Sequence, residues 1–182
     1  MSEPVSALKG AQFDGFASIR EIGPMGMITL RAKAGTKGLE AAIKAATGCA
    51  LPALRRIEVQ GERAAGWMSP DEYLLMLPYA EVAAALSAIK AALKGQHHLA
   101  VNVSDARAVF RIEGAKADQV LRKLSPVDFD MLQPGELRRT RTAQVAAAFW
   151  ADDAGFTLVC FRSVADYVMG LLTHSAQPGS AF

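Results

Sequence analysis

Two adjacent carboxylates, Asp71 and Glu72, stand in the stretch WMSPDEYLLMLP. A carboxylate pair can act as general acid and base, but no neighbouring residue completes such a site here. Ser69 and Glu72 also have the spacing of a helix-capping box. A helix would have to end before Pro78, only a few residues later, and so short a helix is unstable. We therefore interpret residues 69–72 as a type I turn, with Ser first and Pro second, leading into a buried strand.

The other side chains with chemical potential form no recognisable site. His97 and His98 are adjacent, so on a strand they point to opposite faces and cannot chelate one metal ion. The sequence has neither a G-x-x-x-x-G-K-[ST] loop nor a G-x-G-x-x-G pattern. Ser104 lies outside any G-x-S-x-G motif, and Cys49 and Cys160 do not form a C-x-x-C pair. We expect no catalytic, cofactor-binding or metal-ligating residue on this chain.

The segment ELRRTRT, residues 136–142, is the one basic cluster of the sequence. On a strand, Arg139 and Arg141 share a face that Arg138 opposes. One interpretation is a solvated edge strand whose charge discourages aggregation. The other is an arginine pair that meets acidic groups on a partner. The candidate partner-contact residues are Arg138, Arg139, Arg141 and Trp67.

The composition is that of an ordinary globular protein. Of 182 residues, 51% are hydrophobic and 21% are charged, and the net charge of +2 gives no reason to expect nucleic-acid binding. No segment approaches the roughly 20 apolar residues of a membrane span, and the N-terminus lacks the apolar core of a signal peptide. Two unpaired-looking cysteines make a reduced, cytoplasmic protein the simplest expectation.

Apolar periodicity predicts a duplicated unit. The first half reads strand, helix, strand, strand, helix, over residues 27–33, 38–48, 57–68, 73–77 and 82–95. The second half restarts with strand-like runs at 98–103 and 108–114, then a helix at 115–124, strands at 141–150 and 156–161, and a last helix. Ser163 and Asp166 have the spacing of a capping box for that helix.

The two halves align best near their ends. Trp67 precedes Tyr73 by six residues, as Trp150 precedes Phe156, and YLLMLPYAEVAAAL then lies over FTLVCFRSVADYVM. We predict an α+β fold with two similar strand-helix-strand-strand-helix halves, whose antiparallel sheets carry helices packed on one face. Superposition of the halves should bring Trp67 close to Trp150.

The expected boundaries are an irregular N-terminal arm at residues 1–18, a first half at 19–96, a second half at 97–175 and a C-terminal tail at 176–182, together one compact domain. Neither end shows an apolar period. The arm and the tail could therefore lie along a neighbouring chain.

Several stretches resemble the gamma subunit of heterotetrameric sarcosine oxidase. They are GWMSPDEYLLMLP, VNVSDARAVFRIEG, VLRKLSPVDFDMLQPGELRRTRTAQV and GFTLVCFRSVADYVMGLL, and the similarity covers about residues 25–173. The W-x-x-P-D-E-Y-L-L element and the L-S-P-x-D, L-x-P-G, R-T and A-Q-V series carry it. The second half also resembles the first domain of folate-binding aminomethyltransferases, more weakly.

This resemblance implies a subunit of a complex that oxidises sarcosine to glycine and hydrogen peroxide and transfers the one-carbon unit to tetrahydrofolate. It implies alpha, beta and delta subunits as partners. FAD, FMN, NAD and folate are implied for those partners, and no cofactor for this chain. The expected role is a non-catalytic structural one. The alternative is a stand-alone folate-binding or aminomethyltransferase-like protein.

Overall fold

The computed structural model describes residues 3–182. The strands are β1 (Gln12–Asp14), β2 (Ser18–Ile22), β3 (Gly26–Arg31), β4 (Ile57–Gln60), β5 (Arg63–Ser69), β6 (Glu72–Leu77), β7 (Leu99–Asn102), β8 (Arg107–Glu113), β9 (Leu137–Thr142), β10 (Val145–Asp152) and β11 (Gly155–Phe161). The α-helices are α1 (Leu39–Thr47), α2 (Val82–Ala92), α3 (Ala117–Arg122) and α4 (Ala165–Ser175). Short 3-10 helices are η1 (Tyr79–Glu81), η2 (Ser104–Ala106) and η3 (Arg162–Val164).

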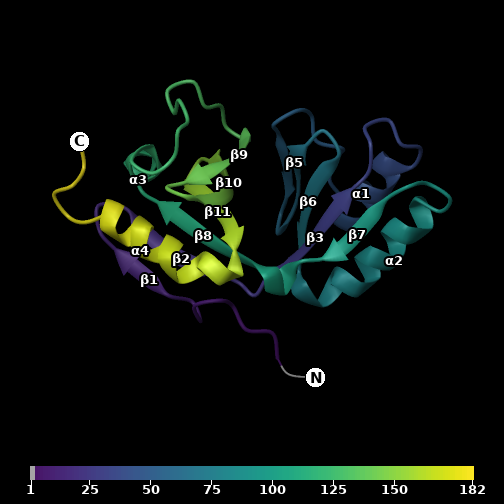
Figure 1. Cartoon of the computed structure of the whole chain (residues 1–182), viewed down its shortest axis with the longest axis horizontal. Helices are drawn as coiled ribbons and strands as arrows, with labels where there is room; N and C mark the ends of the chain where they lie inside the picture. The colour runs from purple at the N-terminus through teal and green to yellow at the C-terminus, as the bar shows by residue number, and fades with distance from the viewer. Residues whose placement is uncertain (1–2) are drawn as a thin grey trace. The chain divides into compact units, whose positions relative to one another are not determined.

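The chain forms two compact units, each with one antiparallel sheet (Figure 1). The continuous unit spans residues 24–104, and its sheet has the order β4-β5-β6-β3-β7. The split unit joins residues up to Gly23 to residues 105–182, and its sheet has the order β1-β2-β8-β11-β10-β9. Two sheets with four helices confirm the expected α+β class.

The two sheets share one strand order, as duplication requires. Read from β7, the first runs β7-β3-β6-β5-β4, which matches β2-β8-β11-β10-β9 of the second. The strand at the start of each repeat, however, pairs in the sheet of the other repeat. β2 precedes β3 in the chain but pairs with β8, while β7 precedes β8 but pairs with β3. The expected division at residues 96 and 97 is therefore wrong, and residues 99–102 belong to the continuous unit.

Each repeat also contains one more strand than the apolar pattern indicated. Residues 57–68 fold as the hairpin of β4 and β5, with Gly61 at φ +60° in the turn. Residues 137–152 form a second hairpin, β9 and β10, with Ala143 at φ +51° between them. Only two residues separate the strands of each hairpin, so periodicity alone did not reveal the breaks.

The helices of each unit pack on one face of its sheet, as expected. In the continuous unit, residues of α1 and α2 join β3, β5 and β6 in one core of buried side chains, including Ile28, Leu30, Ile43, Leu75 and Ile89. In the split unit, α3 and α4 cover Phe110, Phe149 and Leu158 on the corresponding strands. Apolar residues at helical spacing on α1 fix this face, and Gly48 ends that helix in the left-handed conformation.

The expected capping box of the last helix does not form. η3 precedes α4, and Val164 occupies the N-cap without a side-chain hydrogen bond. The continuous unit has the same arrangement, because η1 leads directly into α2. The 3-10 turn replaces the cap, since it satisfies backbone groups at the helix start.

The expected superposition of Trp67 on Trp150 is wrong by one residue. Trp67 lies opposite Tyr73 and packs towards the helices, whereas Trp150 lies opposite Thr157 on the other face of its sheet. A bulge between Trp67 and Ser69 adds a residue to the first hairpin. Because side chains alternate along a strand, this single residue moves the two tryptophans to opposite faces.

The N-terminal arm, from residue 3 onward, docks on its own unit instead of remaining irregular. β1 pairs with β2, and the buried carboxylate of Glu21 accepts hydrogen bonds from the backbone N–H groups of Leu8 and Gly10 at 2.9–3.0 Å. The Arg162 guanidinium donates to the carbonyl oxygens of Val5 and Ser6 at 2.9 and 3.1 Å. Residues 1 and 2 lie outside the described part.

The C-terminal tail is held in the same way. Lys123 donates from Nζ to the carbonyl oxygens of Ser175 and Ser180 at 2.7 and 2.6 Å. The backbone N–H of Phe182 donates to Oε1 of Gln119 at 2.8 Å. The described residues of both ends are thus bound to the split unit.

We predict that a fragment cut at the boundaries of the continuous unit, which includes the exchanged strand β7, folds more stably than a fragment cut at the repeat boundary. A fragment of residues 24–104 keeps β7 and the Ser104 hydroxyl, which accepts the Met27 N–H at 2.9 Å. A fragment of residues 19–96 loses both and leaves β2 without its partner β8. The first fragment should unfold cooperatively on heating, followed by circular dichroism. The second should melt at lower temperature or not fold, and equal melting temperatures would contradict this assignment.

Candidate functional site

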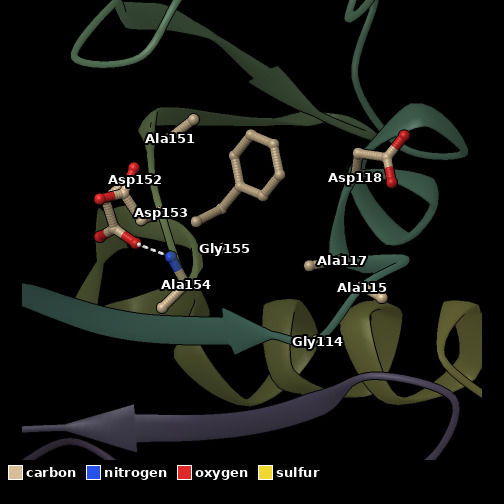
Figure 2. Close-up of a pocket in the computed structure, with 10 residues that line it drawn as sticks. Gly114, Ala115, Ala117, Asp118, Ala151, Asp152, Asp153, Ala154 and Gly155 are labelled. Atoms are coloured by element: carbon tan, nitrogen blue, oxygen red, sulfur yellow. Dashed lines mark hydrogen bonds between the residues drawn. The ribbon is translucent and has the colours of Figure 1, made fainter.

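The candidate site is an open hollow of about 500 Å³ in the split unit (Figure 2). The turn after β8 and the start of α3 form one wall, and the hairpin of β10 and β11 forms the other. Its polar side chains are carboxylates: Asp152 and Asp153 lie on one side and Asp118 on the opposite side (Figure 2). The other lining residues are Gly114, Ala115, Ala117, Ala151, Ala154, Gly155 and Phe156.

The tight turn between β10 and β11 positions Asp152 and Asp153. Gly155 has φ +148°, and a Cβ atom there would collide with the carbonyl oxygen of Ile112 on β8. Glycine therefore permits the close approach of β11 to β8. The Ala154 N–H donates to Oδ1 of Asp152 at 3.0 Å, which closes the turn (Figure 2).

Asp152 is committed to an ion pair. Nη1 of Arg111 donates to one carboxylate oxygen at 2.6 Å and Nη2 donates to the other at 3.1 Å. The Arg111 side chain, 12% exposed, also contacts Glu113 at 3.2 Å and the Thr157 hydroxyl at 2.8 Å. Arg20 on β2 pairs with the second oxygen of Glu113 at 2.8 Å. The network thus links four strands of the sheet: β2, β8, β10 and β11.

The electrostatics of Asp152 follow from these contacts. Partial burial acts to raise the pKa of Asp152, but hydrogen bonds from Arg111 and from the Ala154 N–H outweigh it. The pKa therefore lies below its ordinary value, so this carboxyl is a poor proton donor near neutral pH. A carboxylate neutralised by a bidentate arginine is also a weak cation ligand. The arrangement holds the hairpin of β10 and β11 to β8.

Asp71 serves the same purpose in the continuous unit. Pro70 and Asp71 form the turn between β5 and β6, which confirms the turn interpretation. Nη2 of Arg31 donates to Oδ2 of Asp71 at 2.8 Å, and the Ser69 hydroxyl donates to Oδ1 at 3.0 Å. The hydrogen bond from Arg31 lowers the pKa of Asp71. In both units, an arginine of the strand beside the hairpin holds an acid of that hairpin.

The remaining candidate residues do not come together. His98 contacts the Gln96 carbonyl oxygen through Nδ1 at 2.9 Å. The Ser104 hydroxyl lies 2.6 Å from Oδ1 of Asn102 and closes the junction between β3 and β7. Cys49 and Cys160 are buried free thiols, and burial raises the pKa of Cys160 to about 12. Across residues 3–182, no cluster of three or more His, Cys, Asp or Glu side chains could hold a metal ion.

The candidate partner-contact residues lie in two different environments. β9 is an edge strand, and Arg139 and Arg141 are exposed on one face of it, as expected. Arg138 is half-buried and pairs with Glu136 at 3.0 Å within the chain. Trp67 is half-buried and packs against the core of the continuous unit, so little of it is available to a partner. No sequence pattern indicated the Arg111 network, because only sheet register brings Arg111 to Asp152.

We predict a pH-dependent contribution of Asp152 to stability. Its pKa is lower in the folded than in the unfolded chain, so the folded state binds fewer protons and the stabilisation is present above the ordinary value of 3.8. Asp152→Asn should cost about 1 kcal/mol in urea unfolding at pH 7. The difference from wild type should shrink as pH falls below 3.8. Asp153→Asn, which changes a neighbouring carboxylate, is the matched control. A loss of stability in Asp152→Asn that does not depend on pH would refute the ion pair.

Comparison with known proteins now places this chain. Residues 31–177 match the model of the sarcosine oxidase gamma subunit family. The sarcosine oxidase subunit gamma of Corynebacterium sp. (strain U-96) is 34% identical over 152 residues, covering 80% of this chain and 72% of that protein. A chain of heterotetrameric sarcosine oxidase from Corynebacterium sp. U-96, solved with pyrrole 2-carboxylate, superposes with a TM-score of 0.79 at 27% identity, covering 88% of this chain and 83% of that chain.

Two more distant structures share only the fold. Aminomethyltransferase T of the glycine cleavage system from Bartonella henselae has a TM-score of 0.64 at 13% identity, covering 87% of this chain and 45% of that one. The regulatory subunit of aspartate kinase from Thermus thermophilus has a TM-score of 0.52 at 12% identity, covering 91% and 99%. The family match and the 34% identical relative together show that this chain belongs to the sarcosine oxidase gamma subunit family.

Proposed function

We propose that the chain is a non-catalytic structural subunit of a heterotetrameric sarcosine oxidase. The observation that carries the proposal is the superposition, over 88% of this chain, on a chain of the heterotetrameric Corynebacterium enzyme. The partners are the alpha, beta and delta subunits of the complex. The complex oxidises the N-methyl group of sarcosine to yield glycine and hydrogen peroxide, and passes the one-carbon unit to tetrahydrofolate.

The side chains of this subunit support a role without chemistry of its own. The acids of the two hairpins, Asp71 and Asp152, are held by arginines. The buried side-chain polar atoms of residues 3–182 all have hydrogen-bond partners. Oxidation of an N-methyl group requires an electron acceptor, and we assign FAD, FMN, NAD and folate to the partner subunits.

The location of the complex is a further part of the proposal. Within residues 3–182, no helix is long and apolar enough to cross a membrane. We propose a cytoplasmic location, where the two buried thiols would remain reduced. Arg139 and Arg141 on the β9 edge remain our candidates for pairing with partner carboxylates.

We predict that the chain acts only as part of the complex. Co-expressed with the alpha, beta and delta subunits, it should co-purify with them in equal molar amount, because a subunit without an active site acts through contact. Purified alone, it should be colourless and show no heat of folate binding in titration calorimetry. Tight folate binding to the isolated chain would instead support a stand-alone folate-binding protein, and failure to co-purify would contradict the proposal.

A further inference from the structure

The four edges of the two sheets differ in how they are protected. The edge strands are β1 and β9 in the split unit, and β4 and β7 in the continuous unit. Three of them carry charge: Asp14 on β1, Glu58 on β4 and the arginines of β9. Charge on an edge strand discourages pairing with another chain. β7, with the sequence LAVN, carries no charge and no proline.

β7 is also apolar and exposed. Leu99 is 54% exposed and Val101 is 41% exposed, and they point to the same face because they are two residues apart. An uncharged apolar edge of this kind is a site where an added strand would bind. β7 pairs with β3 along one edge only, and its other edge has no neighbouring strand in residues 3–182.

The hydrogen-bond pattern shows which backbone groups point outward. The Val103 N–H donates to the Met27 carbonyl oxygen at 2.8 Å. Because hydrogen-bonded pairs alternate in an antiparallel ladder, Leu99 and Val101 bond towards β3, and Ala100 and Asn102 turn their N–H and C=O groups outward. Two residues thus offer donors and acceptors for a further strand.

The sheet of the split unit shows which kind of segment can pair with the outer edge of β7. β2 is the counterpart of β7, and its outer edge is covered by β1. Ile19 of β2 lies opposite Ile112 as Ala100 of β7 lies opposite Leu30, so Ile19 and Ala100 are equivalent. Phe13 of β1 lies opposite Ile19 and packs against the helix-side core of the split unit.

The backbone of this template matches that of β7. The Glu21 N–H donates to the Ala11 carbonyl oxygen at 2.8 Å, which makes Phe13 and Ile19 a hydrogen-bonded pair as well. Ile19 therefore bonds outward to β1, as Ala100 is free to do in the other sheet. In residues 3–182 no strand takes the place of β1 beside β7.

We propose that an extended segment of a partner subunit adds to β7 as a sixth strand of this sheet. The segment runs antiparallel to β7 and places a bulky apolar side chain opposite Ala100, where Phe13 lies in the other repeat. Its flanking side chains cover Leu99 and Val101. This inference rests on the proposed function, because it names the surface through which the subunit joins its complex.

Ala100→Pro tests the proposal with the co-expressed alpha, beta and delta subunits. Proline removes an outward N–H without breaking the ladder to β3. We expect the amount of partner that co-purifies to fall about tenfold or more, which corresponds to about 1.4 kcal/mol. The melting temperature of the isolated chain should change little. Normal assembly of a folded Ala100→Pro variant would overturn the proposal.

Val59→Pro is the matched control, because it places the same change on the opposite edge of the same sheet. Trp67 donates its N–H to the Arg56 carbonyl oxygen at 2.9 Å, so the alternation turns Val59 outward, and Val59 is 63% exposed. This control should assemble normally. Loss of assembly in both variants would show a general weakening of the sheet and overturn the assignment to β7.

Hydrogen exchange of the wild-type protein provides a second measurement that needs no variant. The amides of Ala100 and Asn102 should exchange rapidly in the isolated chain and become protected in the complex. A complex that forms but leaves them unprotected would overturn the edge proposal while the proposed function stands. No complex with wild type would refute the function itself. An isolated chain that sediments as a dimer, with Ala100→Pro monomeric, would make a second copy the occupant instead.

Discussion

The exchange of two strands between repeats is the constraint on which the rest of this fold depends. β2 and β7 are the leading strands of their repeats, yet β2 hydrogen-bonds to β8 and β7 to β3, each in the sheet of the other repeat. Backbone N–H and C=O groups of β3 and β8 would otherwise lack partners on one side, and unpaired buried backbone groups are costly. The exchange makes one unit continuous and the other discontinuous, with N-terminal residues built into its sheet.

The same exchange accounts for the anchoring of the arm. Because β2 lies beside β8, the residues that precede β2 also lie against the split unit. There β1 pairs with β2, and the Glu21 carboxylate accepts hydrogen bonds from backbone N–H groups of the arm. Residues 93–98, which precede β7, contain no strand comparable to β1, because α2 ends only a few residues before β7. One repeat therefore has a covered edge, and its counterpart has an exposed apolar one.

Asp71 and Asp152 are held by the same kind of contact. In each unit, a carboxylate at the end of the hairpin accepts hydrogen bonds from an arginine of the strand beside that hairpin in the same sheet: Asp71 from Arg31 and Asp152 from Arg111. The two pairs use different positions, because Arg31 follows Leu30 whereas Arg111 precedes its equivalent, Ile112.

The sequence by itself determined the class of each main element. Helical spacing on α1 and α2, the apolar runs of β6 and β11, and the S-P-D-E turn all folded as their residue types require, because local sterics and burial of one face act over a few residues. The family resemblance was also contained in the residues. Tertiary structure alone decided the exchange of β2 and β7, the opposite faces of Trp67 and Trp150, and the meeting of Arg111 with Asp152. Each of these depends on register or pairing between segments far apart in the chain, where a shift of one residue reverses every side chain, and no local pattern specifies that choice.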